Sequence, residues 1–512
     1  MIEENKSSMK NSVRRIIIAG IGVLIQIIWV VVLLMRLNEY SQIITLLTVA
    51  IELVLVFAVY SMDTNAAFKL PWIILITVAP IVGICVFFLF GRSGATKKVR
   101  ARYRKIDQQL FAYLNQDEQI IEELSKKDER LANDFKYLWK CASSPVYKNT
   151  DVKYYGDTCD AMAAQLEDMM QAKKFIFLEY HAIEMAESFQ ALRKVLMAKA
   201  REGVEIRILY DDAGCIGFLN PRFIKYMESM GIQCRVFNPI MPVLNIFMNN
   251  RDHRKITVID GKVAYTGGYN LADEYFNITH PYGQWKDSGI RFEGDAVQTA
   301  TILFLEMWNA LREQDVDIEK YLPVYPYKAK EQGFFALYGD SPLDKEPAGE
   351  NVYMNLLRHA KKYIYFTTPY LILSDEMTRE LTGAAKRGVD VRIITPGIPD
   401  KKTIFQVTKS YYPQLLKHGV KIYEYTPGFM HEKQCICDGE IVVVGTINLD
   451  FRSLYLHFEN AALFCGYEAV SHVKEDFDAL FPICKDMSKE PSERTRRLRL
   501  SQLILRLFSP LM

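Results

Sequence analysis

The chain has neither the strong positive charge of a nucleic-acid-binding protein nor the paired cysteines of a disulfide-rich protein. Its formal net charge is only +2 over 512 residues, so it lacks the strongly basic character of a nucleic-acid-binding protein, and we expect no nucleic-acid partner. Its 9 cysteines are odd in number and scattered, which argues against a disulfide framework and favours a reducing compartment. The close pair Cys435 and Cys437 has no matching second pair, so buried thiols explain it better than a metal site does.

Three apolar stretches fill the N-terminal part of the chain, at residues 16–35, 43–60 and 72–90. Each is about long enough to cross the apolar core of a bilayer. A cleavable signal peptide does not explain them, because the apolar runs repeat and no small-residue cleavage site follows the first. We therefore predict a transmembrane anchor of two to three helices.

Basic residues flank this predicted anchor on both sides. The positive-inside rule would place both flanks in the cytoplasm, which three full crossings cannot satisfy. One stretch is then re-entrant or interfacial, or the weaker N-terminal bias is overridden. The stronger cluster follows the third stretch, so we expect a multi-pass protein of the cell membrane whose catalytic part is cytoplasmic. That cluster consists of Arg92, Lys97, Lys98, Arg100, Arg102, Arg104 and Lys105.

The rest of the chain contains an internal repeat. Each copy predicts strand, helix, strand, helix and strand, with a glycine ending each helix before a β-branched run. Alternating units of this kind predict an α/β sandwich in which two pseudo-symmetric halves pack together. The paired segments are 175–179 with 363–367, 200–209 with 385–394, and 230–237 with 418–425.

These patterns divide the chain into five predicted regions. They are a membrane anchor at 1–95, a basic helical linker at 96–140, a first α/β half at 141–330, a second half at 331–485 and a basic amphipathic tail at 486–512. The tail suits a helix that lies on anionic lipid, with an ordinary packed terminal helix as the alternative. In the first half, the apolar segment 239–248 could enter lipid or line a groove for acyl chains, and burial in the core explains it equally well.

The pattern His-x-Lys-x-x-x-x-Asp occurs twice, once in each half. With only 8 histidines in the chain, composition predicts roughly 0.03 chance copies, so two copies argue against accident. Each copy is followed at the same offset by a turn that contains glycine and then by an asparagine. The aspartate of each motif is better explained as a structural group than as a reacting one. The first set is His253, Lys255, Asp260, Gly268 and Asn270, and the second is His431, Lys433, Asp438, Thr446 and Asn448.

These residue types suit phosphoryl chemistry. Side chains two apart on a strand lie on one face, so the His and Lys of each motif can share a phosphate. The Asn adds a neutral donor, and the Gly-containing turn lets backbone N–H groups approach closely. Two imidazoles can divide a double displacement: one attacks phosphorus to form a phosphohistidine, and the other protonates the leaving alcohol and then deprotonates the incoming one. Lysines neutralise the developing charge, so we predict no metal and no cofactor.

The paired motifs resemble the HKD signatures of the phospholipase D superfamily. The resemblance implies that a downstream carboxylate orients each histidine, and Asp287 and Glu459 match that role by position. Such a carboxylate fixes the imidazole tautomer and stabilises the imidazolium. Ordinary salt-bridging carboxylates are the alternative. The resemblance makes His253 the nucleophile and His431 the acid and base, whereas the symmetric motifs leave that order open.

Other segments resemble bacterial cardiolipin synthases, the membrane-anchored branch of this superfamily. The third apolar stretch, the turn between the halves and the end of the chain carry this resemblance. The departures are an additional N-terminal span and His457, where asparagine is usual before the carboxylate. The similar segments include Pro71, Trp72, Pro80, Gly83, the turn 339–342 and residues 506–511.

The resemblance implies a phosphatidyltransferase that condenses two phosphatidylglycerol molecules into cardiolipin and glycerol. Phosphatidylglycerol and the membrane are then the expected partners, and the oligomeric state stays open. The nearest alternative is a phospholipase D that uses water, or a transferase that uses another acceptor alcohol such as phosphatidylethanolamine. A catalytically silent scaffold that binds anionic lipid is disfavoured by two complete His-Lys-Asn sets. An endonuclease is disfavoured by the predicted anchor.

Overall fold

The computed structural model describes most of the chain. Half of the first apolar stretch (residues 16–35), the segment 240–248 and most of the tail before residue 500 lie outside the described residues. The described ranges are 21, 24–25, 28–29, 31–36, 42–88, 97–219, 222–239, 249–312, 315, 317–490, 498 and 500–511.

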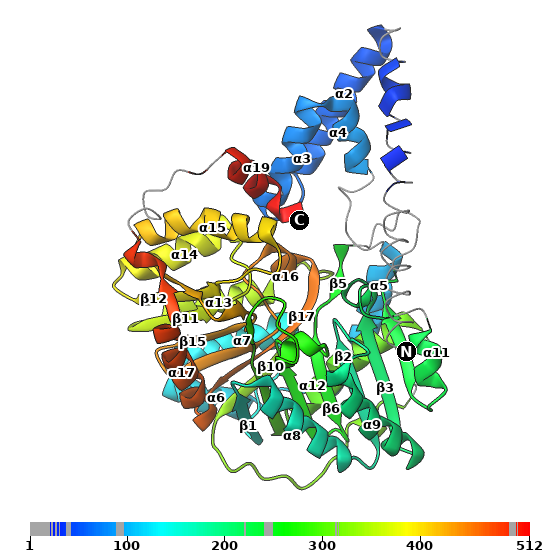
Figure 1. Cartoon of the computed structure of the whole chain (residues 1–512), viewed down its shortest axis with the longest axis vertical. Helices are drawn as coiled ribbons and strands as arrows, with labels where there is room; N and C mark the ends of the chain where they lie inside the picture. Colours follow the sequence, from blue (N-terminus) through cyan, green and yellow to red (C-terminus); the bar gives the residue numbers. More distant parts are fainter. Residues whose placement is uncertain are drawn as a thin grey trace.

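Two β-sheets of matching topology form the body of the molecule (Figure 1). Within the described residues, the first sheet has the strand order β1-β9-β7-β6-β2-β3-β4, and the second has β10-β17-β16-β15-β11-β12-β13-β18. In each sheet three parallel strands continue into an antiparallel hairpin that carries the motif. The predicted α/β fold with two pseudo-symmetric halves is therefore confirmed.

The first half alternates strands and helices as the repeat predicted. Gly203 follows α9 with a φ of +87°, a left-handed conformation that glycine adopts without steric cost, and Gly388 does the same after α14 at +94°. The elements of the first half are β1 (Thr150–Tyr155), α8 (Thr158–Met170), β2 (Phe175–Tyr180), α9 (Glu187–Arg201), β3 (Glu205–Asp211), α10 (Asp212–Cys215), α11 (Phe223–Glu228), β4 (Gln233–Phe237), β5 (Arg251–Asp252), β6 (Lys255–Ile259), β7 (Val263–Gly267), η4 (Asp273–Phe276), β8 (Gln284–Lys286), β9 (Gly289–Gly294), α12 (Val297–Leu311) and η5 (Glu319–Tyr321).

The second half repeats this order. Its elements are β10 (Phe334–Asp340), α13 (Ala348–His359), β11 (Tyr363–Thr367), α14 (Asp375–Lys386), β12 (Asp390–Pro396), α15 (Lys402–Lys417), β13 (Lys421–Tyr425), β14 (Gly428–Met430), β15 (Gln434–Cys437), β16 (Ile441–Gly445), α16 (Phe451–Tyr455), β17 (His457–Cys465), α17 (Glu468–Leu480), η6 (Phe481–Ile483), β18 (Cys484–Asp486) and η7 (Met487–Lys489).

One apolar core joins the two halves. It contains buried side chains of both sheets and of the long helix α12, which is buried over nearly its whole length. Phe292 of the first sheet packs against Phe335 of the second with ring centroids 5.0 Å apart. Since apolar burial contributes about 25 cal/mol per Å², a shared core holds the halves in one fixed relation. The motif strands of both halves can therefore contribute to one site.

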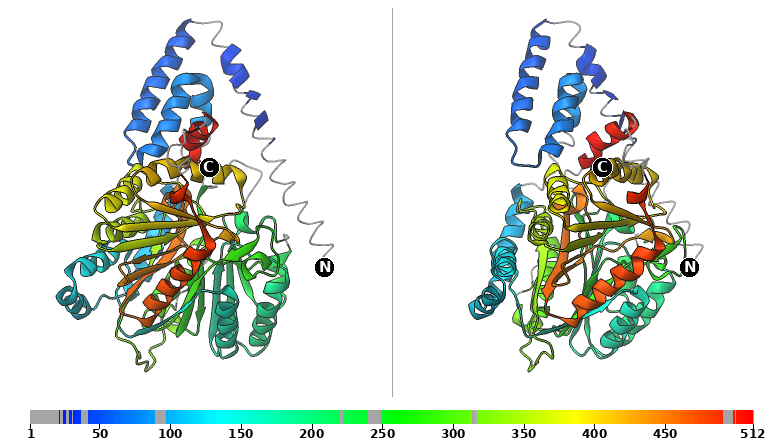
Figure 2. Two further views of the ribbon diagram at one scale, coloured as in Figure 1. Left: turned by 60° about the vertical axis from the view of Figure 1, so that its left-hand side comes forward. Right: turned by 90° about the vertical axis from the view of Figure 1, so that its left-hand side faces the viewer.

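Of the N-terminal helices, α2, α3 and α4 extend from one end of this body, and α5, α6 and α7 lie against it (Figures 1 and 2). The third apolar stretch does not form one continuous helix, because it is divided at Ala79 into α3 and α4. Pro80 disfavours helical backbone at the preceding residue. Gly83 then allows α4 to fold back, since a Cβ there would lie 2.5 Å from the Leu75 carbonyl oxygen. The helices before the first half are α2 (Gln42–Tyr60), α3 (Ala66–Val78), α4 (Pro80–Val86), α5 (Lys97–Leu110), η2 (Phe111–Tyr113), α6 (Glu118–Lys127) and α7 (Glu129–Ala142).

No helix within the described ranges is both long enough and apolar enough to cross a membrane. Many large apolar side chains of α2 are nevertheless exposed, among them Leu46, Val54 and Phe57. The C-terminal helix α19 (Leu500–Phe508), followed by η8 (Ser509–Leu511), lies near α3 and α15 and exposes Leu503 and Ile504.

Candidate active site

Each motif directly follows a short strand that pairs with the other half. β5 runs parallel to β17, and the His253 N–H donates to the Phe458 carbonyl at 2.9 Å. In the equivalent pairing of the second motif, β14 runs parallel to β8, and the His431 N–H donates to the Lys286 carbonyl at 2.8 Å. These pairings bring each motif histidine beside the segment of the other half that carries the predicted carboxylate.

The two carboxylates contact the histidines across the halves. His253 Nδ1 lies 2.9 Å from both carboxylate oxygens of Glu459, and His431 Nδ1 lies 2.5 Å from Asp287 Oδ2. All four side chains are buried. The sequence placed these carboxylates downstream of each motif but did not indicate that each one serves the histidine of the other half. The exchange requires both halves for either pair.

The two lysines lie beside their histidines, as the strand alternation predicts. Lys255 Nζ donates to the His253 carbonyl at 2.6 Å, and Lys433 Nζ lies 2.7 Å from His431 Nδ1. Burial is the main cause that lowers the pKa of Lys255 to about 8 and that of Lys433 to about 7, while the nearby carboxylates oppose this shift. An anionic phosphate would restore a charge partner to both.

The electrostatics of the site favour neutral imidazoles in the absence of substrate. Burial lowers the pKa of His253 well below its ordinary value, and Lys255 and Lys433 lower it further. His431 has its pKa lowered by the same causes. Burial also raises the pKa of Asp287 to about 6, with Lys433 opposing. A neutral imidazole can act as a nucleophile or as a base.

The two predicted phosphate-binding asparagines, Asn270 and Asn448, differ in how far their amide groups are already hydrogen-bonded within the protein. Asn270 is engaged on both sides of its amide, since it accepts from the Ala182 N–H and donates to the Tyr275 hydroxyl. Within the described residues, Asn448 Oδ1 is buried without a hydrogen-bond partner. This Oδ1 is an acceptor that suits a donor group of a ligand, whereas a phosphate oxygen would have to meet the Nδ2 group of Asn448.

Gly268 and Thr446, which the sequence analysis grouped with the phosphate-binding residues, have contacts to the two carboxylate segments. The Gly268 N–H is donated to the Ser288 carbonyl, and a Cβ at this position would lie 2.0 Å from Asp287 Oδ1. Thr446 donates its hydroxyl to Glu459. Both residues therefore act on the carboxylates: one leaves room for Asp287 and the other holds Glu459.

Asp260 and Asp438 have equivalent contacts inside the two halves. Each carboxylate accepts three successive backbone N–H groups, from residues 173–175 and 361–363 respectively. Each aspartate also has a positive φ, of 54° and 53°, in the turn of the motif hairpin. Their contacts are those of structural residues that tie the hairpin to the preceding strand.

Further residues, to which the sequence analysis assigned no role in the site, lie around His253 and Glu459. Ser453 donates to Glu459 at 2.5 Å, and the ring centroids of His181 and His457 lie 5.0 and 5.6 Å from that of His253. His457 precedes Glu459 by two positions on β17, so strand alternation was a signal that could have placed it on the same face. No local sequence pattern indicated His181 or Ser453.

His253, His457 and Glu459 form a group that could hold a metal ion, within the part of the chain that the structure describes. Two of the three already contact each other, since Glu459 accepts from His253 at 2.9 Å. The neighbouring side chain is the cationic Lys255. A site with this charge suits an anion better than a second cation.

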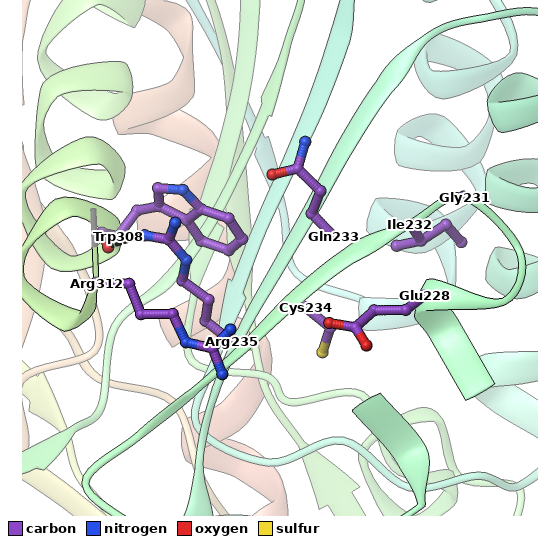
Figure 3. A pocket seen from close by; sticks show the side chains of 8 residues that line it. All are labelled: Glu228, Gly231, Ile232, Gln233, Cys234, Arg235, Trp308 and Arg312. Carbon is purple, nitrogen blue, oxygen red and sulfur yellow. Dashed lines mark hydrogen bonds between the residues drawn. The ribbon is translucent and has the colours of Figure 1, made fainter. Parts of the chain in front are cut away.

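Two cavities lie apart from the motif histidines. One, of about 310 Å³, lies along the edge strand β4, where the Arg235 guanidinium stacks over the Trp308 ring at 4.0 Å (Figure 3). The other, of about 360 Å³, lies between α5, α12 and the connection after β10, and includes Arg254. Neither is lined by His253 or His431.

Comparison with known proteins identifies relatives that align with most of the chain. A family model described as "Cardiolipin synthase, PLD-like domain" matches residues 166–308 and 353–481. An uncharacterized protein of Streptococcus mutans is 39% identical over 452 residues, which cover 88% of this chain and 97% of that protein. The cardiolipin synthase of Halalkalibacterium halodurans is 32% identical over 442 residues, covering 86% of this chain and 87% of the relative.

Solved structures agree on the fold. The phosphatidylserine synthase of Haemophilus influenzae superposes with a TM-score of 0.53 at 14% identity, covering 70% of this chain and 93% of that one. At this identity the likeness concerns the fold alone.

Proposed function

Since the chain belongs to the cardiolipin synthase family of phospholipase D-like phosphatidyltransferases, we propose that it transfers a phosphatidyl group from one phosphatidylglycerol to another, giving cardiolipin and glycerol. The observation that supports this most is the pair of His–carboxylate contacts, His253 with Glu459 and His431 with Asp287, each made between the halves.

The proposed reaction has two displacements at phosphorus. One imidazole attacks the phosphorus of the first phosphatidylglycerol, an N–P bond forms, and the P–O bond to glycerol breaks. The other imidazole, protonated, gives its proton to the leaving glycerol oxygen. It then takes a proton from a terminal hydroxyl of the second phosphatidylglycerol, whose oxygen attacks phosphorus and breaks the N–P bond. Both imidazoles return to their starting states.

In this proposal His253 is the nucleophile and His431 the acid and base, following the family resemblance. The pKa of His431 is lowered by burial and by the lysines in the free protein, so it needs help to carry a proton. A bound phosphodiester anion provides that help, because its negative charge opposes Lys255 and Lys433. Asp287 then stabilises the imidazolium through Nδ1.

Positive charge and donors hold the phosphate. Lys255 and Lys433 supply charge to the non-bridging oxygens, and the Asn448 amide supplies a neutral donor. This assignment leaves Asn270, Gly268 and Thr446 in supporting roles, because their donors are used within the protein.

We also propose that the protein works at a cell membrane, with the α/β body on the cytoplasmic side. The exposed apolar side chains of α2 and α19 offer a surface that suits lipid, and α5 follows with a run of basic residues. A lipid-facing entrance would also favour a lipid alcohol over water as the acceptor.

The test is reconstitution in phosphatidylglycerol liposomes without divalent metal. We expect cardiolipin and glycerol in equal amounts from the wild type, and a loss of about 10⁴-fold or more in His253→Ala and in His431→Ala. His418→Ala, at the end of α15, serves as the control and should retain activity. Phosphatidic acid as the main product would identify a hydrolase, and products that persist in both histidine variants would refute the mechanism.

A further inference from the structure

The proposed reaction needs a place for a second phosphate on the His431 side of the site. In a displacement at phosphorus the entering and leaving groups lie roughly in line, so an acceptor that displaces His253 enters beside His431. An acceptor phosphatidylglycerol brings its own phosphodiester, which three carbons separate from the attacking hydroxyl. In the proposed reaction Lys255 and Lys433 hold the reacting phosphate. The anion of the acceptor therefore requires a further cation on the His431 side.

Lys401 offers an accessible ammonium on that side. It lies at the end of the connection between β12 and α15, and its side chain is 66% exposed. Within the described residues, its ammonium pairs with Asp400 at 3.9 Å, which is too long for a hydrogen bond, and lies 5.8 Å from the centre of the Tyr370 ring. Its three N–H donors are therefore available to an anion from outside the protein.

Backbone hydrogen bonds hold the connection that carries Lys401 against the strand before His431. The N–H groups of Gly397 and Ile398 both donate to the Gly428 carbonyl, at 3.2 and 3.1 Å. Gly428 is the first residue of β14, and His431 directly follows that strand. Lys401 follows Ile398 by three positions, so its backbone lies within about 11 Å of this attachment.

Aromatic side chains connect Lys401 to the His431 imidazole. The Tyr370 ring, which lies beside the Lys401 ammonium, packs against Phe429 at a centroid distance of 6.5 Å. Phe429 in turn packs against His431 at 5.8 Å. The Tyr370 hydroxyl also donates to Asp400 at 2.6 Å, so that carboxylate keeps a partner when Lys401 binds a ligand.

Lys401 differs from an ordinary surface lysine in its effect on His431. Most exposed lysines, such as Lys402 beside it, are solvated charges that contribute little. Burial is the main cause that lowers the pKa of His431, and Lys401 adds to the effect of the motif lysines. An anion bound to Lys401 would offset this charge and help His431 to take the proton of the incoming hydroxyl. A phosphate on the acceptor is an anion that the reaction itself supplies.

We propose that Lys401 binds the phosphodiester of the acceptor phosphatidylglycerol and so favours this lipid over water and small alcohols. The inference rests on the proposed function and adds to it how the acceptor is selected. The second displacement keeps its balance: the acceptor oxygen forms a P–O bond, the N–P bond to His253 breaks, and the hydroxyl proton passes to His431. Water and glycerol carry no anion, so Lys401 gives them no advantage.

The experiment measures how the phosphatidyl intermediate divides between two acceptors, using the full-length protein with EDTA. Vesicles of phosphatidylglycerol and phosphatidylcholine are suspended in buffer that contains labelled glycerol, and the ratio of cardiolipin to labelled phosphatidylglycerol is recorded. Both products arise from the same intermediate, so the ratio reports the second displacement alone. We expect Lys401→Gln to lower the ratio about tenfold, which is the effect of one charge-assisted hydrogen bond. Lys401→Arg keeps the charge and should retain most of the ratio.

Lys402→Gln is the matched control, because it removes the same charge from the neighbouring exposed position and should leave the ratio unchanged. A wild type that forms no cardiolipin would refute the proposed function together with this subsite. If cardiolipin forms and Lys401→Gln leaves the ratio unchanged, only the subsite is refuted. An equal fall of the ratio in Lys402→Gln would also refute the subsite, because general attraction to the anionic vesicle would then explain the effect.

Discussion

His253 and His431 have equivalent carboxylate contacts but different surroundings. His253 lies between His181 and His457, two neutral imidazoles with polar nitrogens. His431 lies among aromatic rings, with Trp285, Tyr275 and Phe429 at centroid distances of 4.9, 5.2 and 5.8 Å. The two motifs therefore keep the same reacting groups in different environments, one polar and one aromatic.

The residue between the His and the Lys of the motif also differs between the two halves. Arg254 is buried and pairs with Glu306 at 2.8 Å. Glu432 occupies the corresponding position and pairs with Lys286 at 2.7 Å. The ionisable residue behind each motif therefore differs, a basic side chain in the first half and an acidic one in the second. Burial raises the pKa of Glu432 well above its ordinary value, and Asp476 raises it further, whereas the pKa of Arg254 is raised mainly by Glu306 and Glu179 against burial.

Removing the carboxylates that contact His253 and His431 should give the largest difference in kcat between the two motifs. Replacing Asp287 with Asn should lower kcat by about 10⁴-fold, because the amide favours the wrong tautomer of His431 and, among the described residues, only Asp287 brings a carboxylate to that ring. Replacing Glu459 with Gln should lower kcat by about 10³-fold, since His181 and His457 offer His253 additional polar neighbours. Steady-state kinetics on phosphatidylglycerol vesicles measure both.

Thr446→Val is the matched control for this pair, because it removes one donor to Glu459 and leaves the carboxylate in place. We expect a loss of about tenfold or less. Equal losses in the two carboxylate variants would show that the different surroundings of the histidines do not affect catalysis.

The buried residues behind the motifs give a difference in stability. Arg254→Met leaves Glu306 buried without its partner and should lower the free energy of unfolding by about 3–5 kcal/mol. Glu432→Gln should cost only about 1 kcal/mol, because Lys286 retains Asp476 and the amide resembles a protonated carboxyl group. Urea denaturation in detergent measures both values.

The double variant Arg254→Met with Glu306→Gln tests the cause. It removes both charges, so most of the lost stability should return. A double variant as unstable as Arg254→Met alone would mean that packing of the arginine side chain, and not its charge, carries the effect.

The sequence was sufficient to predict the strands, helices and motif hairpins of both halves, because alternation and glycine positions are local signals. It also placed Asp287 and Glu459, which follow their motifs at recognisable positions. It did not show that each carboxylate serves the opposite half, since that depends on the pairing of β5 with β17 and of β14 with β8. His181 and Ser453 reach the site through the fold, so only three-dimensional packing reveals them.

The smallest expected difference between the motifs concerns their lysines, and it appears in the pH dependence of kcat/KM. Each lysine must be protonated to hold phosphate, and burial lowers the pKa of Lys433 to about 7 and that of Lys255 to about 8. Charge is therefore lost as pH rises, first from the second motif. We expect kcat/KM for phosphatidylglycerol to fall by up to about tenfold between pH 7 and 8 and more steeply above, since this ratio reports the free enzyme.

Lys433→Arg isolates the contribution of the second motif. Its guanidinium stays charged across this range, so the alkaline fall should move up by about one pH unit, to the region where Lys255 loses its proton. The midpoint of the profile is the relevant quantity, because arginine also changes the geometry and lowers the rate at every pH. A wild-type profile that stays flat to pH 10, or a midpoint that does not move in Lys433→Arg, would contradict the assignment of both lysines to the phosphate.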